Sequence, residues 1–364
     1  MANGKPSKKD LQSNYYKQVL FNQSKYVYAI DPIQYDDTSD VWGMPAAPQL
    51  DFGAVTSNQK ITLSGGVNIN PTDADLIIGY DLFSNKDTTD ISLVITGDAS
   101  ANVQNHIISS VVDIRKDAVA FVSPRQTDVL NSVGSETTKI TTWLTALNIT
   151  SSYAIADSGW KYQFDKYNNV YRWIPLNGDI AGLCVFTDTI RDPWFSPAGF
   201  NRGQIKNCIK LAWNPSKTER DVLYAAGVNP VVTFPGQGTV LYGDKTLQSR
   251  PSAFDRINVR RLFIVLEKAI ASAAKFSLFE LNDEFTRAQF VSLVTPFLRD
   301  VQGRRGITDF KVVCNNTNNT QQVIDSNQFV GDIYIKPARS ANFIQLNFVA
   351  VGTGVEFATI VGAA

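Results

Sequence analysis

Histidine and cysteine are scarce in this chain of 364 residues, which contains one histidine and three cysteines. A single histidine disfavours a zinc site or a histidine-based catalytic triad. His106 falls on the apolar stripe of a predicted helix, so we expect a satisfied or half-buried core histidine. Cys184, Cys208 and Cys314 are widely spaced and form no CxxC pattern. They therefore predict reduced, mostly buried thiols rather than a metal site.

Long apolar runs are also lacking. No stretch of about 18 apolar residues occurs, so we expect no membrane span. The first residues carry lysines but no apolar core after them, which argues against a signal peptide. The SGG sequence at 64–66 lacks the Lys-Ser/Thr pair of a phosphate loop and predicts a turn. We expect no metal, cofactor or catalytic residue.

Apolar side chains are nevertheless plentiful, at 44% of the chain with 11% aromatic residues, so the chain can bury real cores. The charges balance overall but not by halves. Residues 201–364 hold 19 Lys and Arg against 13 Asp and Glu, an excess of six positive charges, and residues 1–200 hold 15 against 21. This difference indicates either scatter over solvated faces or an acidic partner for the second half. Basic and acidic residues are interleaved without a dense basic run, which disfavours nucleic acid as the partner.

The first half alternates between strand and helix patterns. Tyr26–Ile30 predicts a strand after the polar segment 1–20, and short β-branched runs at 91–96 and 118–122 predict buried strands. Helical spacing predicts helices at 74–83, 102–115 and 137–147. Strands between buried helices imply a sheet covered on both faces, so we expect an α/β domain over residues 21–200.

The second half has helices first and strands last. Helices are predicted at 215–226, ended by Gly227, at 256–276, and at 282–301, where Pro296 should interrupt the helix. In the second of these, Arg260, Glu267 and Lys268 should lie outside the apolar stripe. Strands are predicted at 307–314, 329–335 and 342–351. Residues 201–364 therefore form the α+β domain of a chain that is α/β followed by α+β.

A turn separates the two predicted domains. Pro197, Gly199 and Gly203 break the helix and strand patterns, and the two glycines can supply positive-φ positions. Arg202 is placed to brace this turn by donating to backbone carbonyls.

Four aspartates form the sequence pattern that could indicate an enzyme. A carboxylate cluster of Asp165, Asp179, Asp188 and Asp192 would suit an α/β hydrolase-like enzyme, which we keep as the alternative function. Their spacing matches no metal-binding loop. Asp179 is expected instead to cap a helix that starts at Ile180.

Charged residues gather at the start of the longest helix, namely Asp255, Arg256, Arg260 and Arg261. Two interpretations stay open. These residues form a helix-end charge network, or the arginines make bidentate contacts with carboxylates of a neighbouring subunit.

The predicted last strand carries no charge and no proline over residues 342–351. Such a strand is a hazard as a free edge, because its unpaired amides invite another chain. Either it is protected inside its own sheet, or it pairs with a neighbouring subunit. For the second case the predicted interface residues are Phe343, Ile344, Gln345, Leu346, Asn347, Phe348 and Val349. The GTG sequence at 352–354 would let the end of this segment, 343–364, move as an arm.

Five strings in the second half form a specific ordered set. They are YQFDKYNNVYRWIPLNGDIAGLC (162–184), SPAGFNRG (196–203), VLYGDKT (240–246), FDRINVRRLF (254–263) and DIYIKPARSANFIQLNFVA (332–350). In this order they resemble the C-terminal half of the contractile tail sheath proteins of T-even-type bacteriophages.

The resemblance implies a structural subunit and no enzyme. It implies self-assembly into helically stacked six-fold rings around a tail tube, and contraction that drives the tube through the host envelope. Residues 201–364 would form the inner, tube-facing domain, with 343–351 completing a neighbour's sheet. The implied partners are further copies, the tube protein, baseplate and tail terminator proteins, and an N-terminal sheath portion that the resemblance does not cover. The implied location is the virion tail, after assembly in the host cytoplasm.

Overall fold

A computed structural model describes residues 20, 23–24 and 70–342 of the chain. The predicted strand Tyr26–Ile30, the segment 1–19 and the predicted interface residues 343–349 lie outside the described residues. Residues 70–342 belong to one compact unit, and the description below concerns this unit alone.

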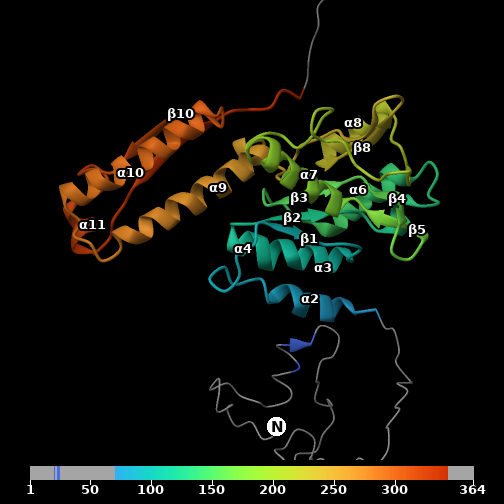
Figure 1. Ribbon diagram of the computed structural model, residues 1–364, viewed down its shortest axis with the longest axis horizontal. Helices are drawn as coiled ribbons and strands as arrows, with labels where there is room; N and C mark the ends of the chain where they lie inside the picture. The colour runs from blue at the N-terminus through green and yellow to red at the C-terminus, as the bar shows by residue number, and fades with distance from the viewer. Residues whose placement is uncertain (1–19, 21–22, 25–69, 343–364) are drawn as a thin grey trace, which may run out of the picture. The chain divides into compact units, whose positions relative to one another are not determined.

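Helices and strands alternate through the first part of this unit (Figure 1). In chain order the elements up to residue 190 are α2 (Asp73–Asp81), β1 (Leu93–Ile95), α3 (Ala101–His106), the π-helical η1 (Ile107–Val112), α4 (Asp113–Arg115), β2 (Val119–Val122), α5 (Gln126–Val129), α6 (Glu136–Leu147), β3 (Ala154–Asp157), β4 (Trp160–Asp165), β5 (Val170–Pro175) and α7 (Asn177–Ile190). The expected mixture of helices and strands is confirmed.

The second part contains the long helices. Its elements are β6 (Lys210–Leu211), α8 (Lys217–Ala226), β7 (Val228–Asn229), β8 (Val231–Phe234), β9 (Gly238–Leu241), the 3-10 turn η2 (Ala253–Asp255), α9 (Ile257–Ala274), η3 (Lys275–Ser277), α10 (Glu284–Gly303), β10 (Ile307–Val313), α11 (Gln321–Asp325) and β11 (Asp332–Pro337).

The central sheet has the order β1-β2-β3-β7 and all its strand pairs are parallel. Alternate residues of β2 face opposite cores. Ala120 and Val122 pack with residues of α3, η1 and α6, whereas Val119 and Phe121 pack with residues of α7 and α9. In Figure 1, α3 and α7 lie on opposite sides of β1 and β2. The run of buried β-branched residues is thus explained by helices on both faces.

A separate core lies between α9, α10 and the antiparallel pair β10–β11. Helix α9 belongs to both cores, because Ile257 and Ile264 pack under the central sheet while Leu262 and Leu266 pack against α10. The two sets lie on different faces of one helix. Figure 1 shows α9 and α10 as neighbouring long helices at the end of the unit remote from β4 and β5.

Helix ends follow the sequence closely where a cap is present. Thr72 and Ser216 each form a capping box, with Asp75 and Glu219 respectively, at the starts of α2 and α8. Gly227 ends α8 at φ +99°.

Three expectations about helices are wrong. Asp179 does not cap α7, which begins at Asn177 and leaves Asp179 within its first turn. Pro296 lies inside α10 without interrupting it. Arg260 is not outside the apolar face of α9 but buried, at 6% exposed. Its long stem and planar head fill space between aromatic rings, which a stripe drawn by residue class does not foresee.

The division of the chain between residues 200 and 201 stays a prediction. The central sheet draws on both sides of it, because β3 before it pairs with β7 after it. Among the described residues no helix is both long and apolar enough to cross a membrane.

The predicted turn at 196–203 lies against β9. Gly199 takes φ +88°, and its N–H donates to Leu241 O at 2.9 Å. Gly203, also expected at positive φ, instead donates to Gly199 O at 2.7 Å. A Cβ on Gly203 would lie 2.7 Å from Gly199 N and 2.8 Å from Gly199 O, so the close backbone approach requires glycine here. Arg202 Nε donates to Ser196 O at 2.9 Å.

Gly203→Ala should lower the free energy of unfolding by about 1–3 kcal/mol, because backbone atoms of Gly199 cannot yield to a Cβ. Urea denaturation followed by circular dichroism measures the change. Gly79→Ala is the control, since no atom lies within 4 Å of a Cβ there. In helix α2 it should raise stability by about 0.5–1 kcal/mol. Equal effects of the two substitutions would contradict the steric argument.

Candidate functional site

The Asp244 carboxylate is 3% exposed and is surrounded by donors. Its Oδ2 accepts hydrogen bonds from Ser196 Oγ at 3.0 Å and Ser340 Oγ at 2.8 Å. Its Oδ1 accepts from Asn342 Nδ2 at 2.7 Å and from Tyr224 OH at 3.4 Å. Arg256 Nε lies 3.6 Å from Oδ1 and supplies the countercharge. A buried carboxylate needs such partners, because desolvation without them costs several kcal/mol. We call these six residues the Asp244 junction.

The junction is fixed to the central sheet through its neighbours in sequence. Asn229 at the end of β7 accepts the Lys245 N–H at 2.7 Å and donates to Ala156 O at 3.0 Å. A Cβ on Gly243 would lie 2.8 Å from Asn229 Oδ1, so this approach also needs glycine. Lys245 Nζ lies 4.3 Å from the centre of the Tyr224 ring and donates to Tyr224 O.

Electrostatics follow from this burial. Burial and the neighbouring Asp244 carboxylate raise the pKa of Tyr224 to about 12. Burial, helped by the nearby Arg256 charge, lowers the pKa of Lys245. The tyrosine hydroxyl therefore stays a neutral hydrogen-bond donor.

Four of the five sequence strings meet at this junction. Ser196 comes from SPAGFNRG, Asp244 from VLYGDKT, Arg256 from FDRINVRRLF, and Ser340 and Asn342 from the last string. The fifth string, 162–184, joins them through α9, where Arg261 Nη1 donates to Cys184 O at 3.4 Å. Strings that lie far apart in the chain thus form one contiguous unit.

The predicted arginine cluster has partners within the chain. Arg260 lies over the rings of Tyr153 and Phe254 at 4.1 and 3.9 Å and donates to Ser152 Oγ at 2.7 Å. Burial lowers the pKa of Arg260, and its Nε has no hydrogen-bond partner among the described residues. Arg261 pairs with Asp188 at 2.5 Å. Contact of this cluster with a neighbouring subunit stays a prediction.

The four aspartates of the enzyme alternative do not form a cluster. Each pairs with a different basic residue: Asp165 with Arg172, Asp179 with Lys161, Asp188 with Arg261 and Asp192 with Arg304. Within residues 70–342, no group of three or more potential metal ligands occurs.

The carboxyl ends of the parallel strands, where α/β proteins often bind ligands, hold a buried polar network. Ser123 Oγ donates to Asp157 Oδ2 at 2.6 Å and accepts the Asn177 N–H at 3.0 Å. Asp157 Oδ1 accepts the Gly159 N–H at 2.9 Å. Burial raises the pKa of Asp157 to about 8. These groups satisfy one another and join strands to α7 rather than line a pocket.

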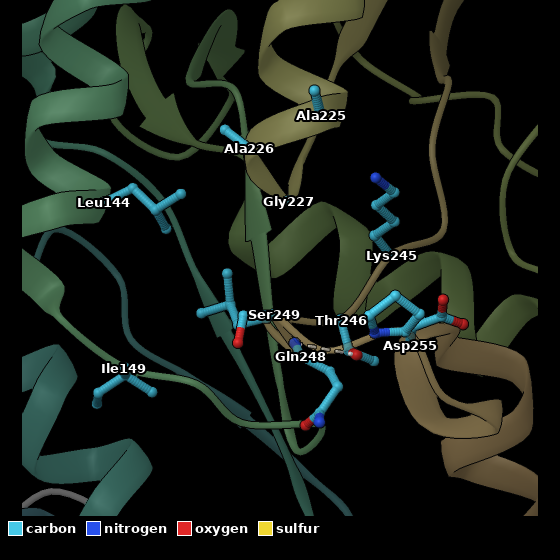
Figure 2. A pocket seen from close by; sticks show the side chains of 12 residues that line it. Leu144, Ile149, Ala225, Ala226, Gly227, Lys245, Thr246, Gln248, Ser249 and Asp255 are labelled. Atoms are coloured by element: carbon cyan, nitrogen blue, oxygen red, sulfur yellow. Dashed lines mark hydrogen bonds between the residues drawn. The ribbon is translucent and has the colours of Figure 1, made fainter.

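An open pocket of about 280 Å³ lies beside the end of α8 (Figure 2). Ala225, Ala226 and Gly227 line one side, and residues 245–249, Pro251 and Asp255 line another. Asp255 is its one carboxylate, and the pocket includes none of the four aspartates discussed above. No nucleophile paired with a base occurs among its lining residues, so it gives the hydrolase alternative no support.

Sequence reasoning missed Asp244 as the meeting point. The available signal was the string VLYGDKT itself, in which an aspartate follows a glycine at the end of an apolar run. Its burial and its distant donors were not readable from local pattern.

Two family models match the chain in consecutive blocks. The phage tail sheath protein central domain matches residues 84–247, and the phage tail sheath C-terminal domain matches residues 249–350. The chain belongs to the phage tail sheath family.

Curated relatives agree. The chain is 48% identical over 330 residues to the tail sheath protein of Vibrio phage KVP40, covering 85% of this chain and 49% of the relative. It is 46% identical over 322 residues to that of Enterobacteria phage T4, covering 84% and 49%. The chain thus spans about half the length of the curated relatives it matches.

Solved structures share the fold. The sheath complex of the extracellular contractile injection system PVC in its contracted state has a TM-score of 0.62 at 18% identity, covering 76% of this chain and 80% of that one. The helical sheath of the anti-feeding prophage in its contracted state also has a TM-score of 0.62 at 18% identity, covering 78% and 76%.

Asp157→Asn should flatten the dependence of stability on pH. The pKa of Asp157 is about 8 in the folded chain and near 4 when unfolded, so unfolding releases a proton between these values. The stabilising contribution is complete below about pH 4 and is lost as pH rises towards 8. Urea midpoints at pH 5, 6.5 and 8 should fall less in the variant than in the parent chain. Asp300→Asn, at an exposed carboxylate, is the control, and identical slopes for Asp157→Asn and the parent would contradict the assignment.

Proposed function

We propose that this chain is a structural subunit of a contractile phage tail sheath. The observation that carries the proposal is the consecutive match of central and C-terminal sheath domains, together with 48% identity to a tail sheath protein. Because the match covers about half of each relative, a further N-terminal sheath portion is a proposed partner.

In this role the subunits polymerise in helically stacked six-fold rings around the tail tube and shorten to drive it through the host envelope. Besides the helical sheath of the anti-feeding prophage, its six-fold symmetrised baseplate contains a chain of similar fold, with a TM-score of 0.62 at 17% identity, and both support self-assembly and baseplate association. Tube and terminator proteins are further proposed partners. The proposed location is the virion tail, and the proposed place of assembly is the host cytoplasm. No catalysis or cofactor belongs to this function.

The C-terminal strand is the proposed link between subunits. Among the described residues, β10 pairs with β11 and no third strand joins them, so this sheet has edges that can accept a strand. The uncharged segment 343–349 suits that pairing, since alternate residues are apolar. The segment begins directly after Asn342, which is a member of the Asp244 junction.

The positive excess of residues 201–364 supports the placing of this part against an acidic tube surface. Such contacts weaken as salt screens them. In the same proposal, residues 21–200 form the preceding sheath domain, and the partly exposed Asp255 and Arg256 contact a neighbour.

Removal of residues 343–364 should leave the fold intact and abolish polymerisation, because these residues follow the described unit and carry the donated strand. Negative-stain electron microscopy over a range of salt and protein concentrations should show hollow tubes or stacked six-fold rings for the full chain and dispersed particles for the shortened one. Phe348→Lys, which places a charge in the strand, should act in the same direction.

Circular dichroism and urea denaturation are the controls for folding. A shortened chain that unfolds would assign the strand to its own sheet and overturn the donation. A full chain that stays monomeric even when mixed with the N-terminal half of a relative's sheath protein would contradict the proposed function.

A further inference from the structure

Residues 338–342 connect β11 to the C-terminal segment and do not run free across the surface. At one end the Ala338 N–H donates to Gly306 O at 3.1 Å, beside the start of β10. At the other end Ser340 and Asn342 donate to the two oxygens of Asp244. Asn342 Nδ2 also lies 3.0 Å from Tyr224 OH on α8. The connector is therefore attached to both parts of the unit.

The two attachments differ in strength. The Ala338 contact joins two neutral backbone groups, whereas both contacts to Asp244 have an ionised acceptor, which makes them roughly twice as strong. Asp244 is also bound by Ser196 and Arg256, so it keeps these partners when the connector detaches. Ser340 is half-buried and Asn342 is exposed, so water can replace their hydrogen bonds when they detach.

We propose that Asp244 anchors the connector and so fixes where the C-terminal segment leaves the subunit. The anchor holds Asn342 beside Tyr224 of α8, at a site formed by residues 196, 224, 244 and 256 rather than by the β10–β11 sheet. A segment that starts from this fixed point has lost part of its conformational freedom before it meets a neighbour. Pre-ordering of this kind lowers the entropy cost of strand donation. This second step rests on the proposed function, whereas the anchor itself does not.

Arg339 provides a direct probe of the anchor. We expect trypsin to cut the Arg339–Ser340 bond when the connector detaches locally. The neighbouring Lys336 precedes a proline and is therefore a poor trypsin site. When reclosing is faster than cleavage, the cleavage rate follows the population of the open form. Release of residues 340–364 is measured by mass spectrometry on the full, unassembled chain.

The combined variant Ser340→Ala, Asn342→Ala should increase this cleavage on the order of tenfold or more, because both hydrogen bonds to a charged acceptor are lost. Thr308→Ala is the matched control, since it removes a side-chain hydrogen bond to Lys336 O within β10–β11 and leaves Asp244 untouched. Peptides spanning 334–346 with and without the two substitutions establish that trypsin itself does not prefer the altered sequence. Equal urea midpoints establish that the fold is retained.

Unchanged cleavage in the combined variant would overturn the anchor. The assembly step has its own readout, the protein concentration at which tubes first appear by light scattering and electron microscopy. This threshold should rise severalfold in the combined variant and stay unchanged in Thr308→Ala. Faster cleavage with an unchanged threshold would overturn the pre-ordering step alone. Failure of the parent chain to polymerise, even when mixed with the N-terminal half of a relative's sheath protein, would count against the proposed function and leave the cleavage result standing.

Discussion

The buried carboxylate of Asp244 constrains how this chain can be arranged. An ionised carboxylate is tolerated at 3% exposure only if several donors and a countercharge surround it. Here those groups come from the turn before β6, from α8, from the start of α9 and from the connector after β11. Each contact is modest by itself. Together they require that four separate segments occupy one place, and this requirement couples the central sheet to the last described residues.

Helix α9 carries the same coupling through apolar packing. One face lies under the central sheet and another packs against α10. At its start, Arg260 lies between the rings of Tyr153 and Phe254, and Arg261 pairs with Asp188 of α7. A cation between rings is a packing contact as much as an electrostatic one. The start of α9 is therefore held in place by two of its own side chains, which lie among residues that precede α9 in the chain.

The polar groups of the described residues give the hydrolase alternative no support. At the carboxyl ends of the parallel strands, Ser123, Asp157 and Asn177 bind one another and leave no unpaired group facing a pocket. Each of the four aspartates that suggested an enzyme forms an ion pair with a different basic residue. Among the described residues, β10 and β11 pair only with each other, and this is the sheet to which the strand donation is assigned in the proposed function.

Local pattern determined much of the secondary structure by itself. Capping residues such as Ser216, the glycine that ends α8 and the short β-branched runs act over a few residues, so their effect is readable from neighbours in the chain. The ordered strings also sufficed to indicate the family. Tertiary structure alone decided the rest: the burial of Arg260, the pairing of Asp179 with Lys161 and the gathering of donors at Asp244. These depend on residues far apart in the chain, such as Asn342 and Asp244 at 98 positions and Arg260 and Ser152 at 108, and no local pattern encodes which distant donor reaches which acceptor.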